Sequence, residues 1–284
     1  MNEILMFLAA PIAMCFLLAG IHCYLGLHVL ARGVIFVDLS LAQIAALGMM
    51  LATLAGFDAN SVWSYLAALL STFVAAGVFA LAKQKNQRFS EEAVIGTVYA
   101  FGAAAAVLAI DKMAHGSEQI KQLLIGNILW VTWSQVLSTS IIYALVATLH
   151  YIFRVKFISA SFSRIPNSQH GITDFAFYAL FGTVITSSVR MSGVLQVFAY
   201  LIVPALLSGI FYTTIRSRLI CGWLLGGTLS AAAMIGSYFL DVPSGAFVVV
   251  CFTILPIGFI LLPQRLLFRK LTASEHTAAV LSHK

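Results

Sequence analysis

The stretch YLGLHVLARGVIFVDLSLAQIAALG, Tyr24–Gly48, decides the fold class, because it is apolar enough for lipid and still carries four polar side chains. These are His28, Arg32, Asp38 and Gln43. A charged side chain near the centre of a bilayer costs roughly 2.5–3.5 kcal/mol on insertion scales. Asp38 lies about a turn and a half inside the apolar run, so we expect it either to face a water-filled path or to pair with a neighbour such as Arg32.

The composition of the whole chain is that of a membrane protein. Of its 284 residues, 61% are hydrophobic and 9% are charged, and the mean hydropathy is +0.98. A soluble domain carries about 25% charged residues. The net charge of +6 is therefore attributed to cytoplasmic loops and not to a nucleic-acid partner. The four cysteines lie in apolar runs without a CxxC pair, and we interpret them as packing residues.

Long apolar runs divide the chain into membrane spans, each needing about 20 residues to cross a core roughly 30 Å thick. The nine candidate segments are 4–29, 34–56, 62–82, 92–110, 128–152, 172–189, 194–213, 219–239 and 245–263. The runs are continuous and do not alternate as in a β-barrel, so the spans should be helices. The sequence predicts an all-α polytopic membrane protein of about nine transmembrane helices, with eight as the alternative count. It forms one transmembrane domain over residues 1–284, with a short cytoplasmic tail at 264–284.

The connections between these segments fall into two alternating sets of very different charge. One set and the C-terminal tail hold 13 of the 16 Lys and Arg residues, and the other set holds only Lys112, Lys121 and Arg190. Basic residues collect in cytoplasmic loops, so we expect the N-terminus outside and the C-terminus in the cytoplasm. The opening apolar run has no basic region ahead of it, and we interpret it as the first span and not as a signal peptide.

Catalytic motifs are absent from the sequence. It contains no GK dipeptide and hence no Walker A loop, no HExxH and no GxSxG. We therefore expect a chain that is not an enzyme. If transport here is driven by ATP, the ATPase must be another polypeptide.

Besides Asp38, three ionisable residues are candidates for a role in the path of a substrate. His22 and His28 on the first span are either packing residues or ligands, and because they are six residues apart they do not simply share one face. Asp241 lies in the short segment DVPSG, where turn chemistry is an alternative to function.

Two further segments near the cytoplasmic side carry open alternatives. Glu91 and Glu92 open the fourth span behind Ser90, where capping of a helix N-terminus competes with a functional role. The longest inside connection, Phe153–Gly171, is amphipathic. It is either an interfacial helix that docks a cytoplasmic partner or a solvated loop.

Five stretches, in order along most of the chain, resemble one family. They are RGVIFVDLSLAQIAALG, EEAVIGTVYAFGAAAA, LLIGNILWVT, SGVLQVFAYLIVPALLSGIF and FLDVPSGAFVVVCFTIL. Together they resemble the permease subunits of bacterial ABC importers for zinc, manganese and iron.

The resemblance implies a multi-pass subunit of the bacterial inner membrane that moves a divalent metal ion as substrate and holds no covalent cofactor. It also implies three kinds of protein partner: a second permease copy, cytoplasmic ATP-binding subunits and an extracytoplasmic metal-binding protein. Asp38, Gln43 and Asp241 would then supply oxygen ligands, with His22 and His28 as further candidates for the path.

This sequence departs from the family pattern at two positions. Relatives hold Asp and His four residues apart on one helical face, whereas Gln43 follows Asp38 by five residues, which rotates the side chains about 140° apart. Ala100 stands where members often carry a second histidine. The loss of two imidazoles disfavours a tight zinc or manganese cage. It leaves open a permease for a metal chelate or another solute, an ATP-independent secondary transporter and, with least support, an intramembrane enzyme.

Overall fold

The computed structural model describes residues 2–59, 61–85, 89–113, 116–162 and 171–261, and this part of the chain contains helices and no strand. The all-α prediction is confirmed. The helices are α1 (Asn2–Arg32), α2 (Val37–Leu54), α3 (Val62–Lys85), α4 (Glu91–Ile110), α5 (Gly116–Ile125), η1 (Ile128–Trp130), α6 (Trp133–Ile152), α7 (Arg154–Phe162), α8 (Gly171–Phe211), α9 (Ile215–Leu240) and α10 (Ser244–Leu261). The predicted tail, 264–284, lies outside the described residues.

Eight helices of the described residues are long and apolar enough to cross a membrane. The difference from the nine predicted segments lies in α8, which is 41 residues long and contains 172–189 and all but the last two residues of 194–213. A straight helix of this length would measure about 60 Å, twice the hydrocarbon core. The helix is interrupted at Gly193, whose backbone (φ 74°, ψ 164°) is not helical.

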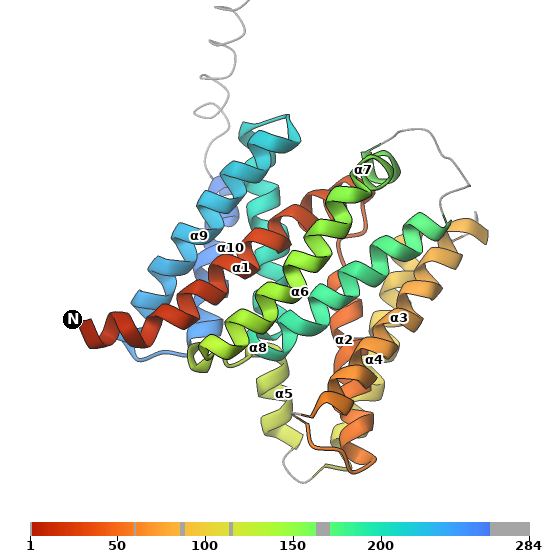
Figure 1. Cartoon of the computed structure of the whole chain (residues 1–284), viewed down its shortest axis with the longest axis horizontal. Helices are drawn as coiled ribbons and strands as arrows, with labels where there is room; N and C mark the ends of the chain where they lie inside the picture. The colour runs from red at the N-terminus through yellow and green to blue at the C-terminus, as the bar shows by residue number, and fades with distance from the viewer. Residues whose placement is uncertain (1, 60, 86–88, 114–115, 163–170, 262–284) are drawn as a thin grey trace, which may run out of the picture.

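The two halves of α8 fold back on each other at this break. Ser188 contacts His22 of α1, and Leu201 packs against Gly26 only four residues further along α1. Ser188 and Leu201 are 13 residues apart, which is about 20 Å along a straight helix. The residues that they contact on α1 are only four residues apart, which is about 6 Å, so α8 is not straight between them. Figure 1 shows the green first half descending and the turquoise second half rising behind α1.

Three glycines from three of the quoted stretches meet at this break. A Cβ on Gly193 would overlap the backbone of Gly126, and a Cβ on Gly126 would overlap that of Ser192. A Cβ on Gly245, at the start of α10, would overlap the carbonyl group of Ile125. The amide of Asn127 donates to the carbonyl of Met191 (2.8 Å). The end of α5 is thus wedged between α8 and α10, and side chains at these positions would push them apart.

Helix boundaries depart from the predicted ones where polar caps intervene. The predicted span 128–152 corresponds to α6, which begins five residues later, at Trp133. Thr132 and Gln135 form a capping box there, with the Thr132 amide donating to Gln135 Oε1 (2.9 Å). The amphipathic connection after α6 contains a helix, α7, whose Phe157 and Ser161 are buried while Val155 and Lys156 are exposed.

The two ends of the bundle carry different connections. Figure 1 shows α7 and the turn between α8 and α9 at the top, and α5 with the turn after α2 at the bottom. The top end therefore carries Arg154 and Lys156 of α7 and Arg216 and Arg218 of α9. This grouping matches the predicted alternation of the loops, and the orientation in the membrane stays a prediction.

Candidate functional site

Asp38 is the buried carboxylate that the sequence singled out. It is 1% exposed, and among the described residues no side chain donates to its oxygens, which have only the backbone amides of Asp38 and Leu39 nearby. It lies in the first turn of α2, because the chain turns at Gly33 (φ 72°) and the helix starts only at Val37. The expected depth of about a turn and a half was therefore wrong. A carboxylate at this place is favoured by the positive end of the helix dipole.

Glu92, at the start of α4, lies near Asp38 in space. Its Oε1 accepts a hydrogen bond from the amide of Phe36 (3.2 Å), which links α4 to the turn before α2. Its Oε2 is buried without a partner in the described part of the chain. Asp38 and Glu92 are close enough for their charges to interact. Two carboxyl groups with unpaired oxygens thus share one small region, which is a chemistry that suits a cation.

The predicted cap of α4 is confirmed, although its two glutamates have other contacts. Ser90 caps the helix by accepting from the amide of Ala93 (3.2 Å). Glu91 accepts a hydrogen bond from the hydroxyl of Tyr178 on α8, so the two glutamates differ in role. Glu91 joins two helices, while Glu92 keeps an oxygen free near Asp38.

Gln43 lies on the same helix as Asp38 but is turned away from it. The two residues are five positions apart in continuous helix, so their side chains point about 140° apart. Gln43 is 8% exposed and packs against α4, where a Cβ on Gly102 would lie 3.2 Å from the Gln43 Cβ.

His22 and His28 are held by hydrogen bonds within the bundle. His22 is fully buried, with Nδ1 2.8 Å from the carbonyl oxygen of Leu18 and Nε2 3.1 Å from Ser188 Oγ. His28 Nδ1 lies 2.9 Å from Ser161 Oγ of α7. These contacts favour packing for His22, because a metal would have to displace one of its two partners.

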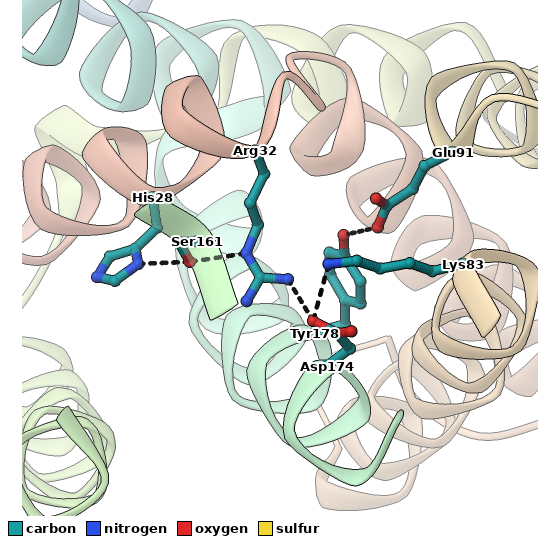
Figure 2. A network of polar contacts seen from close by, with 7 residues as sticks. All are labelled: His28, Arg32, Lys83, Glu91, Ser161, Asp174 and Tyr178. Atoms are coloured by element: carbon teal, nitrogen blue, oxygen red, sulfur yellow. Dashed lines mark hydrogen bonds and ion pairs between the residues drawn. The ribbon is translucent and has the colours of Figure 1, made fainter. Parts of the chain in front are cut away.

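Arg32 forms a network with residues of four other helices (Figure 2). Its Nη1 lies 2.8 Å from Oδ1 of Asp174, and Lys83 Nζ lies 3.1 Å from the same oxygen. Its Nε donates to Ser161 Oγ (2.8 Å), and its guanidinium stacks 3.9 Å from the ring centroid of Phe177. The suggested pairing of Asp38 with Arg32 was wrong, because Asp174 takes that place. Asp38 is left without a charge partner.

Asp241 is the C-cap of α9 and lies in the turn before α10. It is exposed, and its backbone is left-handed (φ 52°, ψ 45°). An aspartate tolerates this conformation better than most residues. The turn itself therefore accounts for the residue type.

A cavity of about 220 Å³ lies further along α2 from Gln43, between α2, α5 and α8. Its wall includes Met49, Met50, Met113, Gln122 and Arg190. From Asp38 to Met49 the helix rises about 16 Å. One face of a single helix thus connects this cavity with the region of unpaired carboxylates.

The described residues contain no group of three or more His, Cys, Asp or Glu side chains close enough to hold a metal ion. The structure brings Asp38 to Glu92 and leaves His22, His28 and Asp241 apart from them. The contact of Glu92 with the turn before α2 and the ion pair of Asp174 with Arg32 were not predicted from the sequence. Asp174 could have been found, because it is the acidic residue in the first turn of an apolar span.

Comparison with known proteins gives a consistent family. A model described as the ABC 3 transport family matches residues 5–262. A Listeria innocua protein named "Manganese transport system membrane protein MntC" is 27% identical over 214 residues, covering 71% of this chain and 76% of that protein. A Haemophilus influenzae protein named "Probable iron transport system membrane protein" is 25% identical over 173 residues, covering 58% and 62%.

Solved structures share the fold. PsaBC from Streptococcus pneumoniae, in complex with Fab, superposes with a TM-score of 0.74 at 20% identity, covering 93% of this chain and 95% of that one. The unpaired carboxylates, the eight apolar helices and the family match lead to one conclusion. The chain belongs to the ABC 3 transport family, as a multi-pass permease subunit of the bacterial inner membrane.

Proposed function

We propose that this chain is the permease of an ATP-driven importer that moves a divalent transition metal ion into the cytoplasm. The observation that carries the proposal is the buried carboxylate of Asp38, which receives no side-chain hydrogen bond from the described residues and lies near Glu92 Oε2, which has no partner among them. A group this costly to bury is expected to serve the substrate of a membrane protein. Members of this family move metals together with ATP-binding and substrate-binding partners.

The path runs along α2. The metal arrives from the binding protein at the cavity near Met49 and moves along the face of α2 that Met49 shares with Asp38. It then reaches Asp38 and Glu92 at the other end of the helix. A few oxygen ligands hold the ion with moderate affinity, which conduction requires if the ion is to leave again. Motion of the partner subunits on ATP binding opens the two ends of this path in turn.

A second copy of the chain completes the site in this proposal. The described residues of one chain offer two carboxylates there and no third His, Cys, Asp or Glu ligand. A homodimer would bring two Asp38 residues to a central path. Carboxylate and amide oxygens suit manganese better than zinc, which prefers imidazole and thiolate. We therefore favour manganese as the metal.

Uptake of radioactive manganese by cells expressing the full transporter tests the proposal. Asp38→Asn keeps the shape of the side chain and removes its charge, so we expect uptake to fall at least about tenfold, the loss of one charged ligand contact of ~1.5 kcal/mol or more. The matched control is Asp111→Asn, because Asp111 is exposed and pairs only with its neighbour Lys112 (3.4 Å). Uptake by Asp38→Asn at the control's level, with equal amounts of protein in the membrane, would contradict the proposal.

A further inference from the structure

An apolar groove of about 620 Å³ lies between α1, α6, α7 and α9, away from the proposed metal path. Its wall includes Phe16 and Tyr24 of α1, Ala147 and His150 of α6, and Trp223 of α9. Trp223 Nε1 donates to the carbonyl of Gly20 (2.8 Å), so the indole presents its apolar surface with its donor already used. The volume lies within the range of small-molecule sites, roughly 300–1,000 Å³.

The length of the groove corresponds to one leaflet of a bilayer. On α6 its lining extends from Ser140 to Tyr151, a rise of about 16 Å. This is half of a hydrocarbon core about 30 Å thick. Because α1, α6 and α9 are all membrane-spanning helices, the groove faces the level at which lipid chains lie.

One end of the groove is cationic. Arg154, at the start of α7, lines this end and is exposed. One of its N–H groups donates to the carbonyl oxygen of Tyr151 (3.1 Å), and the guanidinium lies 4.5 Å from the centroid of that ring. An arginine has five N–H donors, so N–H groups remain at the edge of the guanidinium and can donate to the oxygens of a phosphate group.

His150 lies in the same wall of the groove. It is 2% exposed, and its Nε2 has no hydrogen-bond partner among the described residues. Its Nδ1 lies 3.3 Å from the hydroxyl of Tyr24. Its Nε2 is buried, so His150 contributes ring surface to the groove and not an exposed donor.

We propose that the groove binds one acyl chain of an anionic phospholipid, with the lipid phosphate at Arg154. The cationic end and the apolar remainder follow the order of phosphate and hydrocarbon along such a lipid. The site is independent of the metal and of Asp38. An anionic lipid of the surrounding membrane is then a ligand of this permease.

Native mass spectrometry of the purified full chain tests the site. The protein is incubated with equal amounts of phosphatidylglycerol and phosphatidylcholine, and the retained lipids are counted. We expect phosphatidylglycerol to be retained preferentially, about one molecule per chain. Arg154→Gln should lower this retention about fivefold, the contribution of one basic residue near a charged lipid. The control is Arg216→Gln, an exposed arginine at the same end of the bundle that does not line the groove.

A second variant tests the apolar part separately. Ala147→Trp fills the groove from a position already exposed on α6, so retention of both lipids should fall while elution from a sizing column stays unchanged. Equal retention of the two lipids by the wild type would overturn the proposal, as would equal losses in Arg154→Gln and Arg216→Gln. If Ala147→Trp instead dissociates a dimer and leaves lipid retention intact, the groove holds a second copy of the chain, and the proposal is also overturned.

Discussion

Asp174 neutralises two cations at once, and its removal should be among the most damaging changes in the bundle. Its side chain and that of Arg32 are each 2% exposed. Asp174→Asn would leave the guanidinium buried without a counter-charge, at a cost of about 3–5 kcal/mol. We expect a clearly lower melting temperature for this variant in detergent.

The matched control for Asp174→Asn is again Asp111→Asn. Its ion pair with Lys112 has side chains that are 74% and 75% exposed, and pairs of this kind contribute about 0–1 kcal/mol. If both variants melt like the wild type, the network in Figure 2 does not stabilise the bundle.

Single residues also show what one sequence can and cannot reveal about the site. Asp38 stands out because a carboxylate in an apolar run demands an explanation, and the structure agrees that it is buried and unpaired. Its neighbour Glu92 and the true partner of Arg32 were not predicted. The partner Asp174 is 142 residues away in the chain, and no periodicity or local motif carries information over such a separation.

At the scale of helices, the break in α8 should depend on glycine at position 193. Its φ of 74° and ψ of 164° lie in a region that is essentially reserved for glycine, and a Cβ would overlap the backbone of Gly126. We expect Gly193→Ala to reduce the amount of folded protein severely, measured by fluorescence-detected size exclusion.

Gly258 in α10 provides the comparison, because a Cβ there would meet nothing within 4 Å and its backbone is helical. Gly258→Ala should be neutral or stabilise the protein by up to about 1 kcal/mol. Equal yields of the two alanine variants would show that the break tolerates a side chain.

The positions of the long helices could be predicted from the sequence, but the break within α8 could not. Continuous apolar runs identify every long helix, because lipid requires each backbone group to be satisfied within the segment. The predicted start of α6 is five residues too early. The apolar residues Ile128–Trp130 extend the apolar run toward the N-terminus, past the capping box at Thr132 where the helix begins. Gly126, Gly193 and Gly245 lie in three segments that are far apart in the sequence. The sequence shows the three glycines, but it does not show that they come into contact.

At the scale of the whole molecule, we propose that α7 is the surface on which the ATP-binding partner docks. Phe157 and Ser161 fix the helix to the bundle, while Val155 is 74% exposed at the basic end. We expect Val155→Glu to reduce the amount of ATPase subunit that co-purifies by about fivefold or more, since it places a charge in a contact that apolar surface should fill.

The comparison for Val155→Glu is Val62→Glu, a valine that is 71% exposed at the start of α3, after the turn at the opposite end of the bundle. Undiminished co-purification of the ATPase with Val155→Glu would mean that the partner docks elsewhere. Loss with both valine variants would point to general instability of the permease.

The contact between Arg32 and Asp174 has a consequence for how the protein is made. A ribosome adds about 5–20 residues per second, so the 142 residues between them separate their synthesis by on the order of ten seconds. During this interval the first span resides in the membrane with an unmatched guanidinium at its end. Long arginine side chains can reach the headgroups from such a position. The first helix is therefore expected to wait at a shallower depth and to be drawn into place when α8 leaves the translocon.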